Sequence, residues 1–367
     1  MAAGVGHSKI TSNGLVFAYD QGDTFNSYKG EPTTNICDGT AYSIYNSGAT
    51  NYRNNTEVSP LIPGFEVVKV VADTLGTYGQ SILWKAGYSS AVVTITNSVY
   101  AYLTAGSYVQ VGQHWWPWYY GTAKYIPKNQ WVRISETYTI NEGNSYGTAA
   151  MVYSTDGIAY FTMPQYEIKT HATPFITYNG TRSNTGALLD LSNRGNTIDL
   201  VNMSYDSNAQ PYFDGTDDYT DVTSNLGTLS EYTIEHVSYK GAENKMPISY
   251  RGGPIFYQYG DNSWYYTHGG VAGEYYYPKT VTINGWGHWT IVYNGSYVRI
   301  YRNGVYEGQQ ATSGTADWTN GMRIGRYGPY GYNWNGQIAV VKMYNRALSD
   351  SEVSQNYNHY KTRFNLS

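Results

Sequence analysis

Residues 297–308 read YVRIYRNGVYEG and carry the clearest structural signal in the chain. Side chains that suit a strand lie on both sides of Asn303-Gly304, and their alternation predicts two strands with one buried face each. An Asn-Gly pair adopts the positive φ angles of a type I′ turn at little cost. The stretch therefore predicts an antiparallel hairpin.

Two further segments continue this pattern towards the end of the chain. Residues 321–326 read GMRIGR, and residues 335–352 read NGQIAVVKMYNRALSDSE. Ser349 and Glu352 have the spacing of a capping box, in which each residue caps a backbone N–H of the other. We expect three strands followed by one short helix that ends near Tyr360. This is the one convincing helix in the sequence.

The rest of the chain also reads as strands. Runs rich in β-branched and aromatic residues, bounded by Gly, Asn or Pro, occur at 65–71, 91–96, 131–139, 158–162, 232–237, 288–293 and 298–301. Their alternation indicates antiparallel sheets with one buried and one wet face. The 40 Gly and 42 Tyr, against 8 Phe, fit an all-β protein with many turns. Residues 39–60 are polar, and we expect loop or weakly patterned strand there.

The composition excludes several classes of function. The chain has 367 residues, enough for two domains, with 14% charged residues, a net charge of −4 and no basic stripe, which argues against nucleic-acid binding. Cys37 is the single cysteine, so no intrachain disulfide is possible, and we expect it to be a packed, inert residue. The first residues lack the apolar core of a signal peptide, and no run approaches the roughly 18 apolar residues of a membrane span. We expect a protein made in a host cytoplasm, without membrane insertion.

The closing strands and capped helix resemble the end of a concanavalin-A-like, laminin-G-like jelly roll. That family opens with a strand of the type GLVxxYD, which NGLVFAYD at 13–20 matches. Its second strand, of the type FDGxDDY, is matched only at 212–219 (YFDGTDDY), and LLDLSNRGN at 188–196 resembles the loop that normally precedes it. The resemblance implies a discontinuous jelly roll. Residues 9–32 and 182–363 would form it, and residues 1–8 would be an N-terminal arm.

The intervening residues 33–181 have a sandwich pattern of their own. The strand-like runs at 131–139 and 158–167, followed by ATPF at 172–175, resemble the carbohydrate-binding-module-like sandwiches found inside phage structural proteins. An inserted domain leaves and re-enters its host at nearby points. We therefore expect an all-β fold of two β-sandwiches, in which a laminin-G-like jelly roll is interrupted by a carbohydrate-binding-module-like sandwich.

Together with the opening at 13–35, these motifs resemble a tailed-phage virion protein. The resemblance implies a non-enzymatic structural protein, located in the virion as a head decoration, tail or fibre component. Its implied partners are other virion proteins and further copies of itself, a trimer being one option, with host surface glycans as an additional contact. Two alternatives stay open: a glycan-binding receptor or adhesin module, and a glycan hydrolase.

Glucanases on the concanavalin-A-like fold carry Glu-x-Asp-x-Glu on one strand, so that two carboxylates flank a sugar. The nearest match here is Glu231-Tyr-Thr233-Ile-Glu235, with threonine in place of the aspartate. The stretch also coincides with an ordinary core strand of the family. We interpret the two glutamates as solvent-facing carboxylates of a sheet and expect no enzyme activity.

Calcium is the cofactor that the sequence allows. Asp214, Asp217 and Asp218 lie within five residues, and Asp20 would be near them if the jelly roll is split. Carboxylate oxygens suit Ca²⁺, whereas the alternative is that these residues only shape a turn. The seven histidines show no zinc-type pairing, and we expect no other cofactor.

Clustered aromatic residues are the remaining candidates for carbohydrate or partner binding. Consecutive aromatics on a strand cannot all face the core, so some are exposed or covered by a partner. The candidates are Trp115, Trp116, Trp118 and Tyr120 in the insert, and Trp264, Tyr265, Tyr276 and Trp334 in the jelly roll. A sugar-stacking platform and a protein interface both fit. The pattern favours an interface for the first group and leaves the second open. The Gly and Pro of residues 327–334 predict an exposed turn.

Overall fold

The computed structural model describes residues 10–37, 42–45, 65–71, 81–113, 121–153, 157–239, 245–250, 253–258, 264–266, 285–328 and 332–367. The chain divides into two compact units. One comprises the chain up to Glu31 together with Ser183–Ser367, and the other comprises Pro32–Arg182. The described part of both units is built from strands, with two helices, α1 (Asn184–Ala187) and α2 (Asp350–Lys361). The fold is all-β.

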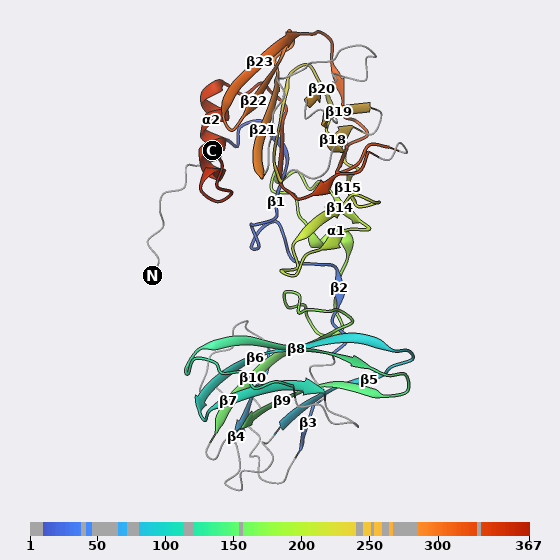
Figure 1. The fold of residues 1–367 in the computed structure, drawn as a ribbon, viewed down its shortest axis with the longest axis vertical. Helices are drawn as coiled ribbons and strands as arrows, with labels where there is room; N and C mark the ends of the chain where they lie inside the picture. Colours follow the sequence, from blue (N-terminus) through green and yellow to red (C-terminus); the bar gives the residue numbers. More distant parts are fainter. Residues whose placement is uncertain are drawn as a thin grey trace. The chain divides into compact units, whose positions relative to one another are not determined.

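The first unit is a jelly roll of two six-stranded antiparallel sheets (Figure 1). The order in the first sheet is β1 (Leu15–Asp20), β27 (Ile338–Tyr344), β17 (Tyr232–Tyr239), β21 (Trp286–Tyr293), β22 (Tyr297–Arg302) and β23 (Val305–Ala311). The order in the second sheet is β12 (Ile198–Val201), β15 (Tyr219–Val222), β25 (Met322–Ile324), β18 (Lys245–Tyr250), β19 (Gly253–Gln258) and β20 (Trp264–Tyr266). Short strands complete the unit: β13 (Ser204–Tyr205), β14 (Pro211–Asp214) and β26 (Asn335–Gly336) form one ladder, and β16 (Thr228–Leu229) pairs with β24 (Ala316–Asp317).

Apolar side chains of the two sheets meet in one core. Phe17, Ile234 and Trp289 enter it from the first sheet, and Leu200 and Ile324 enter it from the second. The opposite face of the first sheet is covered too, because Val340 of β27 packs with Tyr360 of α2 in a separate buried cluster. The central strands β27 and β17 are thus covered on both faces, which explains why they are almost continuously buried.

The second unit is a smaller sandwich. One of its sheets has the order β4 (Val67–Val71), β10 (Ile158–Glu167), β6 (Val93–Ala105), β8 (Trp131–Ile140), and the other has the order β3 (Tyr42–Tyr45), β5 (Ser81–Tyr88), β9 (Ser145–Tyr153), β7 (Tyr108–Gln113). The short strands β2 (Thr33–Thr34) and β11 (Thr181–Arg182) pair at the two ends of this segment. Cys37 is fully buried in its core, as expected for a packed residue.

The two local motifs that open the sequence argument are present. Asn303 and Gly304 have φ values of 48° and 73°, and the turn joins β22 to β23. The Ser349 side chain accepts a hydrogen bond from the Glu352 N–H, and the Glu352 side chain accepts one from the Ser349 N–H, so the capping box of α2 is confirmed. Among the described residues no helix has the length and apolar character needed to cross a membrane.

Candidate functional site

Glu231 and Glu235 have the spacing of glucanase carboxylates, and the surroundings of Glu235 indicate its role in this chain. Glu231 is exposed, but Glu235 is completely buried on β17, so the interpretation that both face solvent is wrong for the second residue. Its Oε1 lies 2.6 Å from Nε2 of His288 and 3.5 Å from Nζ of Lys342. Its Oε2 accepts a hydrogen bond of 2.8 Å from Nδ2 of Asn356 on α2. Every side of this carboxylate is occupied by the protein itself.

The electrostatics of this cluster are those of a structural ion pair. Burial pushes the pKa of Glu235 upwards, but the positive charge of Lys342 and the contact with His288 outweigh it and hold the pKa at about 2. Burial lowers the pKa of the neighbouring His236 to about 3, so this imidazole is neutral. A general acid of a glycosidase needs a raised carboxyl pKa and access to the sugar. Glu235 has neither, and it instead ties the first sheet to α2.

Three of the four candidate metal ligands come together. Asp214 ends β14, Asp218 directly precedes β15, and one oxygen from each of Asp214, Asp217 and Asp218 lies within 4.8 Å of the others. We call Asp214–Asp218 the carboxylate loop. Asp20 does not join it, in contrast to the expectation. Its carboxylate is held by Arg363, 2.7 Å away, at the end of β1.

The carboxylate loop is partly stabilised by its own hydrogen bonds. The N–H of Asp214 donates to Oδ2 of Asp218 (2.8 Å), and Oδ1 of Asp214 accepts from the N–H of Thr216 (2.7 Å). Asn202 donates to Oδ2 of Asp217 (2.8 Å). Burial nevertheless raises the pKa of Asp218 above its ordinary value. The loop therefore has the turn geometry expected of Asp-Gly-Thr-Asp and, in addition, a buried acid.

The structure describes only some of the aromatic candidates. Trp115, Trp116, Trp118, Tyr120 and Tyr276 lie outside the described residues. Trp264 and Tyr265 belong to β20, the edge strand of the second sheet, where their backbones pair with Gln258 and Tyr257.

The prediction that residues 327–334 form an exposed turn is wrong for Trp334. Its side chain is fully buried in the jelly-roll core, because its N–H bonds to the carbonyl of Gly325 (2.7 Å) and draws the end of the loop inwards. Among the described residues of the loop, Tyr332 stacks on Tyr327 with ring centroids 6.3 Å apart, and 37% of Tyr332 is accessible. Trp334 cannot serve as a binding platform in this conformation.

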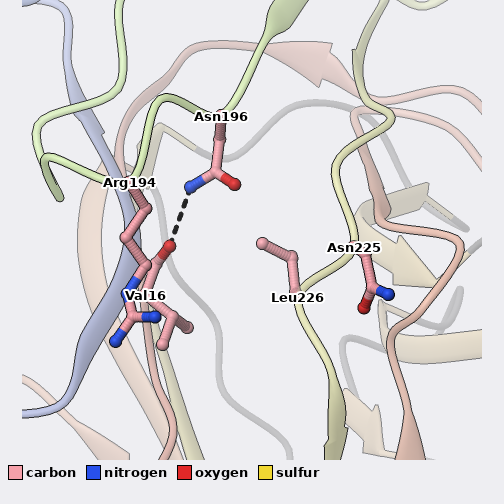
Figure 2. Close-up of a pocket in the computed structure, with 5 residues that line it drawn as sticks. All are labelled: Val16, Arg194, Asn196, Asn225 and Leu226. Carbon is pink, nitrogen blue, oxygen red and sulfur yellow. Dashed lines mark hydrogen bonds between the residues drawn. The ribbon is translucent and has the colours of Figure 1, made fainter.

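A hollow of about 400 Å³, which the sequence analysis did not identify, lies beside the resemblance motif LLDLSNRGN. Its lining residues are Val16, Arg194, Asn196, Asn225 and Leu226. Figure 2 shows Val16, Arg194 and Asn196 on one side and Asn225 and Leu226 on the other. Val16 and Leu226 are buried, whereas Arg194 and Asn225 are exposed at the rim.

The wall of the hollow is the edge of the first sheet. β1 is the outermost strand there, and residues 190–196, here called the edge loop, cover its free backbone groups. Oδ1 of Asp190 accepts from the N–H of Ala18 (3.0 Å), and Nδ2 of Asn196 donates to the carbonyl of Val16 (2.8 Å; Figure 2). The pairing with β27 shifts register between Leu15 and Phe17, which frees that carbonyl for the loop. The motif thus protects an edge strand and shapes the hollow.

The hollow has the chemistry of a small polar binding site. Its accessible lining is mostly polar, and its rim carries the Arg194 guanidinium and the Asn225 amide, whose Oδ1 already accepts from the Gly227 N–H. Nitrogen donors on a mostly polar wall suit a ligand that offers hydroxyl or carboxylate oxygens. No group at this rim is placed for acid–base chemistry.

One protein-family model matches part of the chain. The family model of the concanavalin A-like lectin/glucanases superfamily matches residues 214–354, less than half of the chain. Together with the two packed antiparallel sheets, this match supports a concanavalin A-like jelly-roll fold for this part of the chain. No curated protein matches.

Several solved structures are similar. Domain 4 of an extracellular arabinanase of Geobacillus stearothermophilus, solved with arabinotriose, is 12% identical, with a TM-score of 0.37 over 48% of this chain and 93% of that one. The botulinum neurotoxin serotype D binding domain is 14% identical, with a TM-score of 0.37 over 48% of this chain and 49% of that one, so the match spans about half of that binding domain. A heptameric SAP-like pentraxin from Limulus polyphemus is 17% identical, with a TM-score of 0.33 over 39% and 78%.

Proposed function

We propose that this chain is a non-enzymatic structural protein of a tailed-phage virion, acting as a head decoration, tail or fibre component. The observation that carries the non-enzymatic part is the burial of Glu235 among His288, Lys342 and Asn356, which removes the glutamate pair with glucanase-like spacing. The virion part is supported by the resemblance of residues 13–35, 212–219 and 344–352 to such proteins.

Mass spectrometry of gradient-purified particles tests membership of the virion. The proposal expects the chain at a fixed copy number per particle that survives repeated purification. Electron microscopy of particles labelled with an antibody against the chain then gives its position. Absence of the chain from purified particles, together with failure of the purified protein to bind particles that lack it, would refute the virion role.

The hollow favours one alternative, a glycan-binding receptor or adhesin module. In that case the purified chain binds glycans on a broad array, and an Arg194→Ala/Asn225→Ala variant loses at least tenfold in affinity, since both donors at the rim are removed. Arg302→Ala is the matched control, because this arginine pairs with Glu307 on β22 and β23 instead. Silence across the array would count against this alternative.

The glycan hydrolase is the third function, and Glu231 is the residue on which to test it. Our proposal expects no release of reducing ends from host polysaccharide by either the native chain or Glu231→Gln. Hydrolysis by the native chain that disappears in this variant would establish an enzyme. Glu231 is the proper target because it is exposed, so its replacement leaves the fold intact.

A further inference from the structure

Seven asparagines in the chain are directly followed by glycine, the neighbour that most favours spontaneous loss of the side-chain amide. Glycine has no Cβ, so its backbone nitrogen can approach the side-chain carbonyl carbon of the preceding asparagine closely. The pairs are Asn13-Gly14, Asn179-Gly180, Asn284-Gly285, Asn294-Gly295, Asn303-Gly304, Asn320-Gly321 and Asn335-Gly336. Asn284 lies outside the described residues, which leaves six described pairs.

This reaction has requirements that a fold can meet or block. The asparagine side chain must rotate until Cγ lies beside the next backbone nitrogen, this nitrogen must give up its proton, and water must have access. A hydrogen bond made by the side-chain amide or by the glycine N–H holds these groups in place and has to break first. The hydrogen bonds of each pair therefore predict how fast it reacts.

The side chain of Asn303 is the most firmly held of these amides. Its Oδ1 accepts a hydrogen bond from the N–H of His288 (3.0 Å), and its Nδ2 donates one to the carbonyl of Ser367 (2.7 Å). Both ends of the amide are fixed, so Cγ cannot turn towards the nitrogen of Gly304 unless both bonds break. Asn303 is therefore protected although its sequence is reactive.

Four further pairs are restrained by single groups. The side chain of Asn294 accepts two backbone hydrogen bonds, and that of Asn335 donates one to the carbonyl of Asp214. In the other two pairs the glycine N–H is engaged, because Gly180 and Gly321 each donate, over 2.9 Å, to the carbonyl three residues earlier. Each of these pairs thus lacks either a free amide or a free nitrogen.

Asn13 differs from the other described pairs. Its side chain is exposed, and within the described residues neither this side chain nor the N–H of Gly14 forms a hydrogen bond. The glycine is also required at its position. Its φ is +78°, and a Cβ there would lie 3.0 Å from Cγ of Arg346. The turn before β1 therefore needs the same residue that makes Asn13 reactive.

We propose that Asn13 is a site of spontaneous deamidation, which loosens the start of β1. The nitrogen of Gly14 attacks Cγ of Asn13 and loses its proton, the Cγ–Nδ2 bond breaks, and the amide nitrogen leaves as ammonia with that proton. The five-membered succinimide that results then takes up one water molecule. Hydrolysis at Cγ gives aspartate. Hydrolysis at the backbone carbonyl gives isoaspartate, in which the main chain runs through the former side chain and is one carbon longer.

The contacts of this turn couple the modification to the edge of the first sheet. Nε of Arg346 donates to the carbonyl of Asn13 (3.0 Å), and the N–H of Asn345 donates to the carbonyl of Gly14 (2.9 Å). Both donors directly follow β27, the strand with which β1 pairs. A longer main chain at residue 13 moves the carbonyls that these donors need, and so weakens the attachment of β1. This inference is independent of the proposed virion function.

Peptide mapping by mass spectrometry of the full chain, sampled during incubation at pH 8 and 37 °C, tests the site. We expect Asn13 to lose its amide roughly tenfold faster than Asn303, or more, because two hydrogen bonds must break before the Asn303 side chain can rotate. Asn303 is thus an internal control with the same neighbour. Both aspartate and isoaspartate should accumulate at position 13. Equal rates at the two asparagines, or no conversion of Asn13, would overturn the proposal.

A variant tests the link between the modification and stability. Asn13→Gln keeps an exposed amide, but the longer side chain reacts more slowly because it must close a six-membered ring. After the same incubation the native chain should have a lower Tm than before, whereas the Tm of Asn13→Gln should be unchanged. Conversion of Asn13 without a drop in Tm, or an equal drop in both chains, would refute the link to β1.

Discussion

At the scale of single residues, the buried contacts of Glu235 are those of a structural ion pair and not those of a catalytic acid. The carboxylate is fixed by His288, Lys342 and Asn356, which are 53, 107 and 121 residues away in sequence. No local pattern could reveal these partners, and so sequence reasoning assigned the residue to a wet sheet face. By contrast, the replacement of the middle aspartate by Thr233 is visible in the sequence and argues against a glucanase site.

Loss of the Glu235 charge should destabilise the jelly roll strongly. Glu235→Gln leaves Lys342 buried without its counter-charge, which typically costs about 3–5 kcal/mol. Chemical denaturation at neutral pH measures this cost. Glu231→Gln, four residues earlier and exposed, should change the free energy of unfolding by less than about 0.5 kcal/mol. Equal effects of the two substitutions would show that the buried cluster is not important for stability.

The same carboxyl predicts a dependence of stability on pH. Its pKa in the folded chain is about 2, below the ordinary value of 4.5, so its contribution to stability is complete above pH 4.5 and is lost as the pH falls towards 2. The shift corresponds to roughly 3 kcal/mol. The difference in unfolding free energy between the native chain and Glu235→Gln should shrink across this window. A difference in unfolding free energy that stays constant between pH 6 and pH 3 would contradict this prediction.

At the scale of elements, locally encoded features were predictable and long-range ones were not. The Asn303-Gly304 turn and the capping box at Ser349 and Glu352 are each complete within four residues, and both are confirmed. The burial of Trp334 depends on a hydrogen bond to Gly325 and on core contacts that the loop's own Gly and Pro do not reveal. The edge loop was recognised as a motif, but its hydrogen bonds to β1 required the structure.

Gly304 lies where the turn between β22 and β23 packs against α2, and its replacement tests this contact. A Cβ there would lie 2.8 Å from Cδ1 of Tyr357 on α2, in a backbone with φ of +73°. Gly314 also has a positive φ, +108°, but a Cβ there meets nothing within 4 Å. We expect Gly304→Ala to destabilise the jelly roll by about 1–2 kcal/mol more than Gly314→Ala in thermal unfolding. Equal losses of stability in the two variants would mean that the turn at Gly304 does not pack closely against α2.

At the scale of the whole molecule, the organising feature is a sheet completed by a distant segment. β1 pairs with β27 more than three hundred residues later, and its Phe17 and Tyr19 are buried in the core formed by Ser183–Ser367. The sequence indicated this arrangement through a resemblance, since the opening and second strands of one fold stand almost two hundred residues apart. The aromatic residues 115–120 and 276 lie outside the described residues, so their binding role stays a prediction.

The measurement that tests this account most directly is the cooperative unfolding of two shortened chains. In the first, an Asn-Gly turn joins Thr34 to Thr181, which are paired in β2 and β11, so that β1 stays attached to the remaining jelly roll. The second contains residues 183–367 alone. We expect a single sharp thermal transition for the first chain and no cooperative transition for the second, which lacks β1. A stable, cooperative fold of residues 183–367 with the same Tm would contradict a single jelly roll built from two segments.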